Sequence, residues 1–331
     1  MNYKGVSIII CCFNSSLLLE ETLKHIAVQK LDNAACEIVL VDNASTDHTQ
    51  EIARSIWEKS GSDKISFKIV YEPKPGLTFA RQKGVNEARF EYLIFCDDDN
   101  WLDENYVQNT IELFKEHTDT GILGGNGSAI FEDEALKPLW FSTFLDMYAA
   151  VPQAKKETAL DFVYGAGMAV RKTVLKEVMG KYPMLLKGRE KAILSSGEDS
   201  EICLRARLAG HKILYSPKLT FKHFIINKRL TWSYLKKLDT GLAKTFVIIN
   251  LYETALNSKR LSLPLFYWLK KMLYYWGIYF KYWPKHYLIY RKTEGTIAEL
   301  HHITWKNIAL DYLKYNFKTV SIYNKIIAFK K

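Results

Sequence analysis

Three consecutive carboxylates, Asp97, Asp98 and Asp99, directly follow the apolar run "YLIFC" in this 331-residue chain. Charges of one sign repel each other, and the repulsion grows where a buried strand lowers the local dielectric. A hard divalent cation removes that cost, because Mg²⁺ binds one or two protein carboxylates and completes its shell with phosphate oxygens. The run therefore predicts a metal site that recruits a phosphorylated ligand. The alternative is a solvated turn in which Asn100 or Asp103 caps the next helix.

The segments around this run alternate between short apolar stretches and amphipathic ones. We expect four strand and helix pairs, at 6–12 and 17–29, 37–41 and 48–59, 66–72 and 77–89, and 91–96 and 104–117. Apolar runs without strict alternation are typical of strands that are covered on both faces, as in a parallel sheet. The chain therefore begins with a doubly wound α/β domain. Ligands bind outside the carboxyl ends of such strands, where Asp42 and the carboxylate run stand.

The pattern is less regular after residue 120. Gly-rich, short strand-like pieces occupy about 121–170, a helix is expected over 198–210, and the short strands "KILYS" and "KLTFKHF" follow. After His223 the chain has 19 basic and 5 acidic residues, whereas 27 basic and 31 acidic residues precede this point. We therefore expect an acidic catalytic domain over 1–225 and a basic, aromatic helical region over 226–331.

The five cysteines form no Cys-x-x-Cys pair and lie in or beside apolar runs. This arrangement indicates neither a zinc site nor a disulfide framework, and it favours a reducing compartment. The apolar run "VSIIICCF" near the N-terminus is shorter than a usual secretory core and has no small-residue cleavage site after it. We interpret it as the first strand and expect a cytoplasmic protein.

Several motifs in a fixed order resemble the family 2 glycosyltransferases, which have the GT-A fold. The resemblance runs from about residue 5 to 225. It rests on "VSIIICCFNSS", "EIVLVDNASTDHT", "PGLTFARQKGVNEA", "YLIFCDDDNWL" and "GEDSEICLRARLAGHKI". Each motif is weak alone, and the ordered set is specific. The resemblance implies a GT-A, Rossmann-like, mostly parallel sheet with flanking helices, and a nucleoside diphosphate sugar as donor.

The resemblance also assigns roles around the nucleotide. It implies that Asp42 accepts hydrogen bonds from the base of the nucleotide, and that Arg81 lies near the nucleotide. Asp99 is then the direct ligand of a Mg²⁺ or Mn²⁺ ion and Asp97 lies nearer the ribose, while Asp98 could serve either way. The structural alternatives are a strand-end turn residue for Asp42 and a surface salt bridge for Arg81.

Asp199 matches the general base of the family, which removes a proton from the acceptor hydroxyl. It stands in the first turn of the expected helix, where the dipole stabilises a carboxylate and weakens it as a base, so simple helix-end charge is the alternative. His223 matches a histidine that approaches the metal or the diphosphate, although a lone histidine is often structural. Gly165 and Gly167 resemble the stretch under the donor sugar, where small residues let the backbone come close.

Residues 261–292 are dense in Trp and Tyr, and lysine recurs among them. Lys270, Lys271 and Lys281 interrupt every apolar run before it reaches the roughly 18 residues of a spanning helix. Such a segment suits the headgroup region of an anionic membrane, and we expect peripheral contact with the inner face of the cell membrane. The alternative is a helical subdomain that packs its aromatic side chains on the catalytic body. Nucleic acid would also suit aromatic and basic residues, but no motif supports it, and we expect none.

Together these observations predict an inverting, metal-dependent glycosyltransferase that acts on a glycan or lipid-linked acceptor in the synthesis of cell-surface polysaccharide or glycolipid. A nucleotidyltransferase also combines such a sheet with paired aspartates, but "CCFNSSLLLE" after the first strand is not a Gly-rich loop with lysine. A noncatalytic protein that binds membranes or nucleic acid is the alternative of another class.

Overall fold

The computed structural model describes residues 5–180, 182–186, 188, 197–290 and 296–330. Its strands form one sheet with the order β3-β2-β1-β4-β8-β6-β9-β5, and β7 pairs with β9. The strands are β1 Gly5–Cys12, β2 Ala35–Asp42, β3 Ile65–Tyr71, β4 Tyr92–Asp97, β5 Asn100–Leu102, β6 Thr120–Phe131, β7 Thr158–Ala159, β8 Ala169–Arg171 and β9 Lys212–Ile225. The helices are α1 Leu19–Ala27, α2 Thr49–Ser60, α3 Leu77–Glu87, α4 Tyr106–Glu116, α5 Lys172–Gly180, α6 Glu198–Leu208, α7 Trp232–Asn257, α8 Tyr267–Tyr290, α9 Ile297–Tyr315 and α10 Lys318–Ile327.

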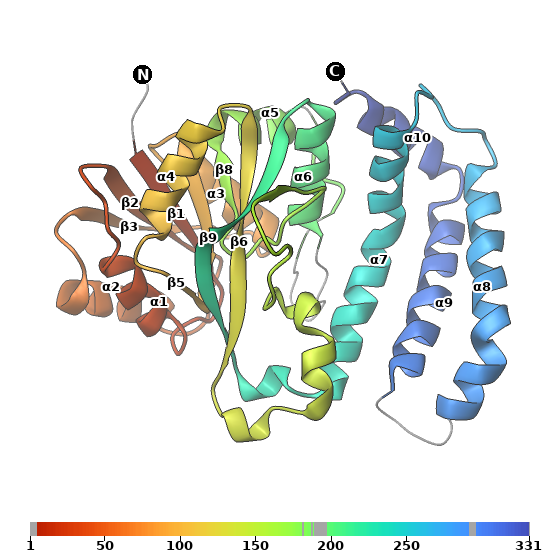
Figure 1. Cartoon of the computed structure of the whole chain (residues 1–331), viewed down its shortest axis with the longest axis horizontal. Helices are drawn as coiled ribbons and strands as arrows, with labels where there is room; N and C mark the ends of the chain where they lie inside the picture. Colours follow the sequence, from red (N-terminus) through yellow and green to blue (C-terminus); the bar gives the residue numbers. More distant parts are fainter. Residues whose placement is uncertain (1–4, 181, 187, 189–196, 291–295, 331) are drawn as a thin grey trace.

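The first four long strands are parallel, as the apolar runs predicted. Successive residues of β1 point to opposite faces, so Ile8 and Ile10 pack with α1, α2 and α4, whereas Ile9 packs with α3, α5 and α6. In the register, Cys12 lies beside Asp42 and Cys11 beside Asp97. The carboxyl ends of β2 and β4 therefore place their acidic residues on either side of β1, at one edge of the sheet (Figure 1).

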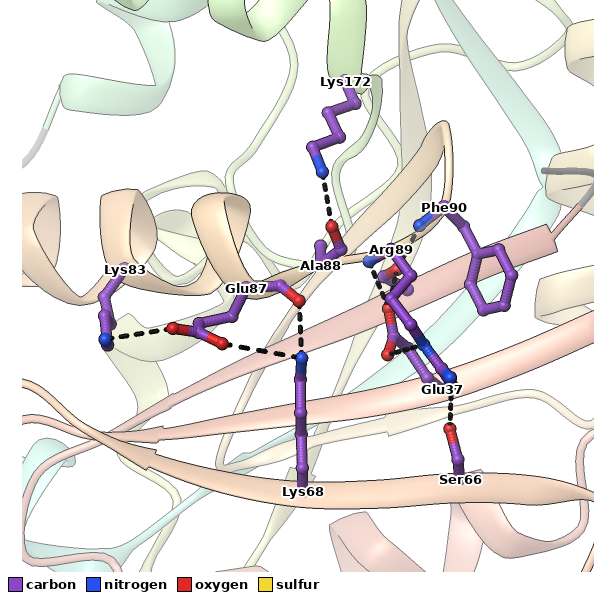
Figure 2. A network of polar contacts seen from close by, with 10 residues as sticks. Glu37, Ser66, Lys68, Lys83, Glu87, Ala88, Arg89, Phe90 and Lys172 are labelled. Carbon is purple, nitrogen blue, oxygen red and sulfur yellow. Dashed lines mark hydrogen bonds and ion pairs between the residues drawn. The ribbon is translucent and has the colours of Figure 1, made fainter. Parts of the chain in front are cut away.

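A polar cluster ties the opposite edge of the sheet together (Figure 2). The buried Glu37 at the start of β2 accepts a hydrogen bond of 2.6 Å from Ser7 of β1. It also forms an ion pair of 2.8 Å with the Nε atom of Arg89, which precedes β4 and reaches Ser66 of β3. Four strands are thereby joined at their amino ends, which leaves their carboxyl ends to form the site.

The second half of the sheet is more continuous than the sequence predicted. The two short strands expected around residue 215 are one strand, β9, which runs through Pro217. The pairing of β9 with β6 shifts at this point, between Gly124 and Asn126, so the proline lies where a ladder hydrogen bond is already missing. The Gly-rich pieces after residue 120 include the twelve-residue strand β6.

The C-terminal part is helical, as predicted. Helix α7 packs against α6 and α10, and α8 packs with α7 and α9, so α8 lies farthest from the sheet (Figure 1). Within the part of the chain that the structure describes, no helix has the length and apolar content needed to span a membrane. The division of the chain at residue 225 stays a prediction.

Candidate active site

A cavity of about 790 Å³ lies at the carboxyl edge of the parallel strands. Loops after β1, β2, β3 and β4 contribute to its lining, together with the segment before β8 and residues of α6, β9 and α7. Most of the predicted site residues line it together: Arg81, Asp97, Asp98, Asp99, Asp199 and His223. Side chains that are more than 100 residues apart in the sequence therefore face one space.

Asp42 is buried and does not belong to the described lining of this cavity. Its carboxylate accepts hydrogen bonds from the backbone of Ser45, at 3.0 Å, and from the side chain of Gln50. The next residue, Asn43, does line the cavity, and its amide bonds to the carbonyl of Lys74 and the N–H of Gly76, each at 2.7 Å. Asp42 therefore orders the loop after β2, and its contact with a nucleotide base stays a prediction.

Asp98 shows the effect of burial and of neighbouring charge within the carboxylate run. Its carboxylate accepts a hydrogen bond from the hydroxyl of Ser15, and its carbonyl accepts one of 2.7 Å from Thr22. Burial, together with the neighbouring charge of Asp99, raises the pKa of Asp98 to about 7. The proximity of these carboxylates therefore opposes ionisation of Asp98, in line with the repulsion argument.

Asp99 is paired with a cation that the sequence reasoning did not identify. Its Oδ2 atom lies 2.6 Å from Nη1 of Arg229, at the end of the short helix η4, Asn227–Arg229. Burial alone would lower the pKa of Arg229, but the charge of Asp99 raises it. Tyr148 donates a hydrogen bond of 2.9 Å to the carbonyl of Arg229 and so holds η4 against the cavity. An arginine six residues after a histidine forms no pattern that a single sequence reveals.

His223 is held in one tautomer. Its Nδ1 atom lies 2.6 Å from the carbonyl oxygen of Tyr148, which only accepts, so Nδ1 carries the proton. Its Nε2 atom faces the cavity corner, 3.3 Å from Nη1 of Arg229 and 3.4 Å from Oδ2 of Asp99. A histidine that donates its other N–H to a carbonyl has the arrangement common in metal ligands.

The donor types of this corner fit a divalent cation. Oxygen ligands from the carboxylate run suit Mg²⁺ or Mn²⁺, and the imidazole suits Mn²⁺ as well. Burial and the charge of Asp99 raise the pKa of Asp98, so a bound cation would favour its ionised form. Among the residues that the structure describes, no three His, Cys, Asp or Glu side chains are gathered closely enough to enclose an ion. Arg229 occupies part of that position, because it pairs with Asp99.

Arg81 is buried rather than on the surface, so the surface salt bridge is wrong. Its Nη1 atom lies 3.1 Å from Oε1 of Glu198, which is buried in the first turn of α6. Burial alone would lower the pKa of Arg81, but Glu198, Asp97 and Asp199 raise it together. Arg81 therefore links α3 to the start of α6 and stays charged.

Asp199 is oriented by two backbone N–H groups. Its Oδ2 atom accepts a hydrogen bond of 2.8 Å from Gly165, and its Oδ1 atom accepts one of 2.7 Å from Ser200. A Cβ atom at Gly165 would lie 2.9 Å from Oδ2 of Asp199 and 3.0 Å from Nη2 of Arg81. A larger residue there would displace the carboxylate or the guanidinium. Each carboxylate oxygen keeps a lone pair for a hydroxyl in the cavity.

Comparisons with known proteins agree with this geometry. The model of "Glycosyl transferase family 2" matches residues 7–179. The putative glycosyltransferase EpsH of Bacillus subtilis (strain 168) is 26% identical over 255 residues, which are 77% of this chain and 69% of EpsH. The poly-beta-1,6-N-acetyl-D-glucosamine synthase of Staphylococcus epidermidis is 24% identical over 176 residues, 53% of this chain and 41% of the synthase.

Solved structures share the fold. Residues 1–349 of S. aureus TarS, in complex with UDP-GlcNAc, align with a TM-score of 0.55 at 14% identity, over 98% of this chain and 90% of that chain. GalNAc-T7 with UDP, GalNAc and Mn²⁺ aligns with a TM-score of 0.54 at 16% identity, over 77% of this chain and 50% of that chain. The predicted GT-A fold is thereby confirmed. Because the family model covers just over half of the sequence, the chain belongs to glycosyl transferase family 2.

Proposed function

We propose that this chain transfers a sugar from a nucleoside diphosphate sugar to a hydroxyl of a glycan or lipid-linked acceptor, with inversion at the anomeric carbon. The observation that carries the proposal is the shared cavity, which brings the carboxylate run, Arg81 and Asp199 together at the carboxyl edge of the sheet. The UDP and UDP-GlcNAc in the solved structures of GalNAc-T7 and TarS favour a uridine diphosphate sugar as donor.

Asp199 acts as the general base in this proposal. The acceptor hydroxyl donates a hydrogen bond to a free lone pair of the Asp199 carboxylate, which the N–H groups of Gly165 and Ser200 hold in place. As the acceptor oxygen attacks the anomeric carbon, its proton passes to Asp199. The bond from that carbon to the diphosphate breaks, and its electron pair leaves with the nucleoside diphosphate. One displacement of this kind inverts the configuration.

The departing diphosphate needs positive charge around it. Arg229 provides a cation at the edge of the cavity, next to Asp99. Asp99 and His223, with Asp97 or Asp98, would hold a Mg²⁺ or Mn²⁺ ion. When bound, that ion neutralises charge on the leaving diphosphate. Arg81 keeps Glu198, and with it the first turn of α6 that carries Asp199, in position.

A thermal-shift screen of nucleoside diphosphates, with and without Mn²⁺, tests this function. A ligand that binds only the folded chain stabilises it by about 2.7 kcal/mol at a hundredfold excess over its Kd. We expect a Mn²⁺-dependent rise in Tm with at least one nucleoside diphosphate. Asp99→Asn should abolish the Mn²⁺ dependence. The control Asp119→Asn, at an exposed ion pair with Lys212, should keep it. If no nucleoside diphosphate shifts the wild-type Tm in either condition, the proposal fails.

We further propose that α8 contacts the inner face of the cell membrane peripherally, as the basic aromatic segment predicted. The part that packs inward includes Tyr275, which is buried among α7, α8 and α9. The opposite face presents Leu273, Tyr274 and Phe280, each about 60% exposed, at helical spacing. The helix has no acidic residue, and Lys270 belongs to the same face by its spacing. Aromatic and basic groups on one face suit an anionic lipid surface.

Sedimentation with vesicles tests this contact. We expect the chain to sediment with vesicles of phosphatidylcholine and phosphatidylserine in a 7:3 ratio, roughly the anionic content that attracts basic helices. It should remain in solution with pure phosphatidylcholine. Phe280→Ser should reduce the bound fraction severalfold. The control Leu136→Ser changes a leucine outside the helical region that is exposed to a similar extent as Phe280, and it should leave the bound fraction unchanged. Equal binding by the two variants would exclude this face as the contact.

A further inference from the structure

One helix of the C-terminal region lines the cavity with apolar side chains. Tyr234, Leu238 and Leu242 recur every four residues along α7, and all three face the cavity. Residues at this spacing share one face of a helix. Leu242 is 37% exposed, and it is one of the residues that line the cavity. The cavity thus has an apolar wall that the proposed reaction does not use.

This wall runs from the carboxylate run to the base. At one end, the ring of Tyr234 lies 6.1 Å from the ring of Tyr148, whose hydroxyl bonds to Arg229. At the other end, the side chain of Thr245 lies 3.3 Å from the Cβ position of Gly197, two residues before Asp199. Eleven residues of helix span roughly 16 Å. Leu242 lies about one turn from Thr245, at the end that approaches the start of α6.

A second apolar side chain, outside α7, also lines the cavity. Phe162 lines the cavity and is 45% exposed, three residues before the glycine that donates to Asp199. The segment is fixed by Gln153, which accepts a hydrogen bond of 3.1 Å from the N–H of Tyr164 and donates one of 3.3 Å to the carbonyl of Phe162. Phe162 is therefore held at the cavity and is not a loose surface residue.

The side chains that α7 and Phe162 contribute to the described lining of the cavity are uncharged. In the lining that the structure describes, the two arginines, Arg81 and Arg229, are each paired with a carboxylate. An uncharged apolar group would therefore bury surface favourably against these side chains.

We propose that the acceptor carries an aliphatic group next to its reacting sugar, and that Leu238, Leu242 and Phe162 bind this group. The inference rests on the proposed function, because Asp199 marks where the acceptor hydroxyl must lie. Leu238 and Leu242 gain from burial of apolar surface, and a hydrocarbon chain offers that surface. The acceptor is then a glycolipid or a lipid-linked sugar rather than a free polysaccharide.

Binding of matched glycosides tests this inference without requiring turnover. Octyl and methyl β-glycosides of glucose, galactose and N-acetylglucosamine are titrated below the micelle concentration, and UDP with Mn²⁺ is present. Saturation-transfer NMR reports their Kd values. We expect each octyl glycoside to bind at least tenfold more tightly, which corresponds to burial of about two methylene groups. The octyl methylene protons should receive the strongest saturation.

Leu242→Gln should bring the Kd of the octyl glycosides to within about threefold of the methyl ones. The control Leu310→Gln, at a leucine of α9 that is 40% exposed, should retain the full difference. Equal Kd values for octyl and methyl glycosides in the wild type would overturn the inference. So would equal weakening of both glycosides by Leu242→Gln, which would assign the wall to the pyranose ring. Absence of UDP binding in the same samples would instead count against the proposed function.

Discussion

At the scale of single residues, the least expected feature is the cation that faces the carboxylate run. Arg229 and Asp99 are 130 residues apart, and their charged atoms lie 2.6 Å from each other with little exposure to solvent. A buried ion pair that loses one partner leaves an uncompensated charge. Arg229 therefore has a structural role at Asp99 as well as the proposed role at the diphosphate.

Arg229→Gln should lower the free energy of unfolding by about 3 kcal/mol in the absence of metal. The exposed pair between Lys212 and Asp119 provides the control, because Lys212→Gln should cost about 1 kcal/mol or less. Urea denaturation measures both. Mn²⁺ should restore part of the loss in Arg229→Gln, since it supplies the missing charge. Equal destabilisation by the two variants would show that Asp99 does not need Arg229.

The pKa of Asp98, raised to about 7, predicts a dependence of stability on pH. The ordinary value is 3.8, so between about pH 4 and 7 the folded chain binds more protons at Asp98 than the unfolded chain does. The contribution of this group to stability is therefore fully present below about pH 4 and is lost as pH rises through 7.

The prediction concerns the metal-free protein. Its urea midpoint should fall between pH 5 and pH 8, and Asp98→Asn should reduce this fall, because the amide does not titrate. Mn²⁺ should raise the wild-type midpoint more at pH 8 than at pH 5, since the ion competes with the proton. A wild-type profile identical to that of Asp98→Asn would contradict the assignment of this titration.

At the scale of elements, the segment before β8 determines how α6 presents its base. Gly165→Ala would place a Cβ atom 2.9 Å from the Asp199 carboxylate and 3.0 Å from the Arg81 guanidinium. We expect this variant to lower kcat for sugar transfer at least tenfold, because a shift of the base by a few tenths of an ångström misaligns proton transfer. Overpacking should also cost about 1–3 kcal/mol of stability.

Gly180→Ala is the matched control, because nothing lies within 4 Å of the corresponding Cβ position at the end of α5. Its kcat and Tm should match the wild type. Steady-state kinetics and thermal unfolding of both variants give the comparison. Wild-type kcat in Gly165→Ala would mean that this close approach has no part in catalysis.

The sequence predicted the elements whose apolar pattern is strong. The parallel strands β1, β2 and β4 and helix α6 were expected within about two residues of their observed bounds. The second half of the sheet was harder, because the glycines of β6 and Pro217 in β9 are typical of loops. Their strand conformation depends on pairing between segments about 90 residues apart, and local propensity does not encode that pairing.

The site was predictable to the same extent. The carboxylate run and Asp199 stand at ends of elements that a pattern can locate, and both face the cavity. The partners of these groups were not predictable. Arg229 of η4 and Tyr234 of α7 reach the cavity through the tertiary packing of segments that follow β9. The site therefore draws on residues from both sides of the predicted boundary at residue 225.

At the scale of the whole molecule, a buried polar network joins the catalytic body to the helical region. Tyr252 of α7 donates a hydrogen bond of 2.7 Å to Glu201 and accepts one of 2.8 Å from Arg205, both in α6. Glu201 and Arg205 also form a buried ion pair of 2.7 Å. Tyr252→Phe should lower the free energy of unfolding by about 1.5–3 kcal/mol, because two charged groups lose a partner.

The control for this change is Tyr274→Phe, at a tyrosine of α8 that is 60% exposed. This substitution should leave the free energy of unfolding unchanged. Urea denaturation should show one cooperative transition for both variants and for the wild type, since α6 and α7 share a core. Two separate transitions in the wild type would contradict the coupling of the two regions.

The central claim is that Asp199 activates an acceptor hydroxyl for attack on a nucleoside diphosphate sugar, and one kinetic comparison tests it most directly. Nucleoside diphosphate release is measured for wild type, Asp199→Asn and the control Asp161→Asn. Asp161 is an exposed residue that pairs with Arg207, which lies in α6 as Asp199 does. We predict that Asp199→Asn lowers kcat at least 100-fold while the donor still raises its Tm, and that Asp161→Asn behaves as wild type. Wild-type kcat in Asp199→Asn, or release of pyrophosphate in place of nucleoside diphosphate, would contradict the account.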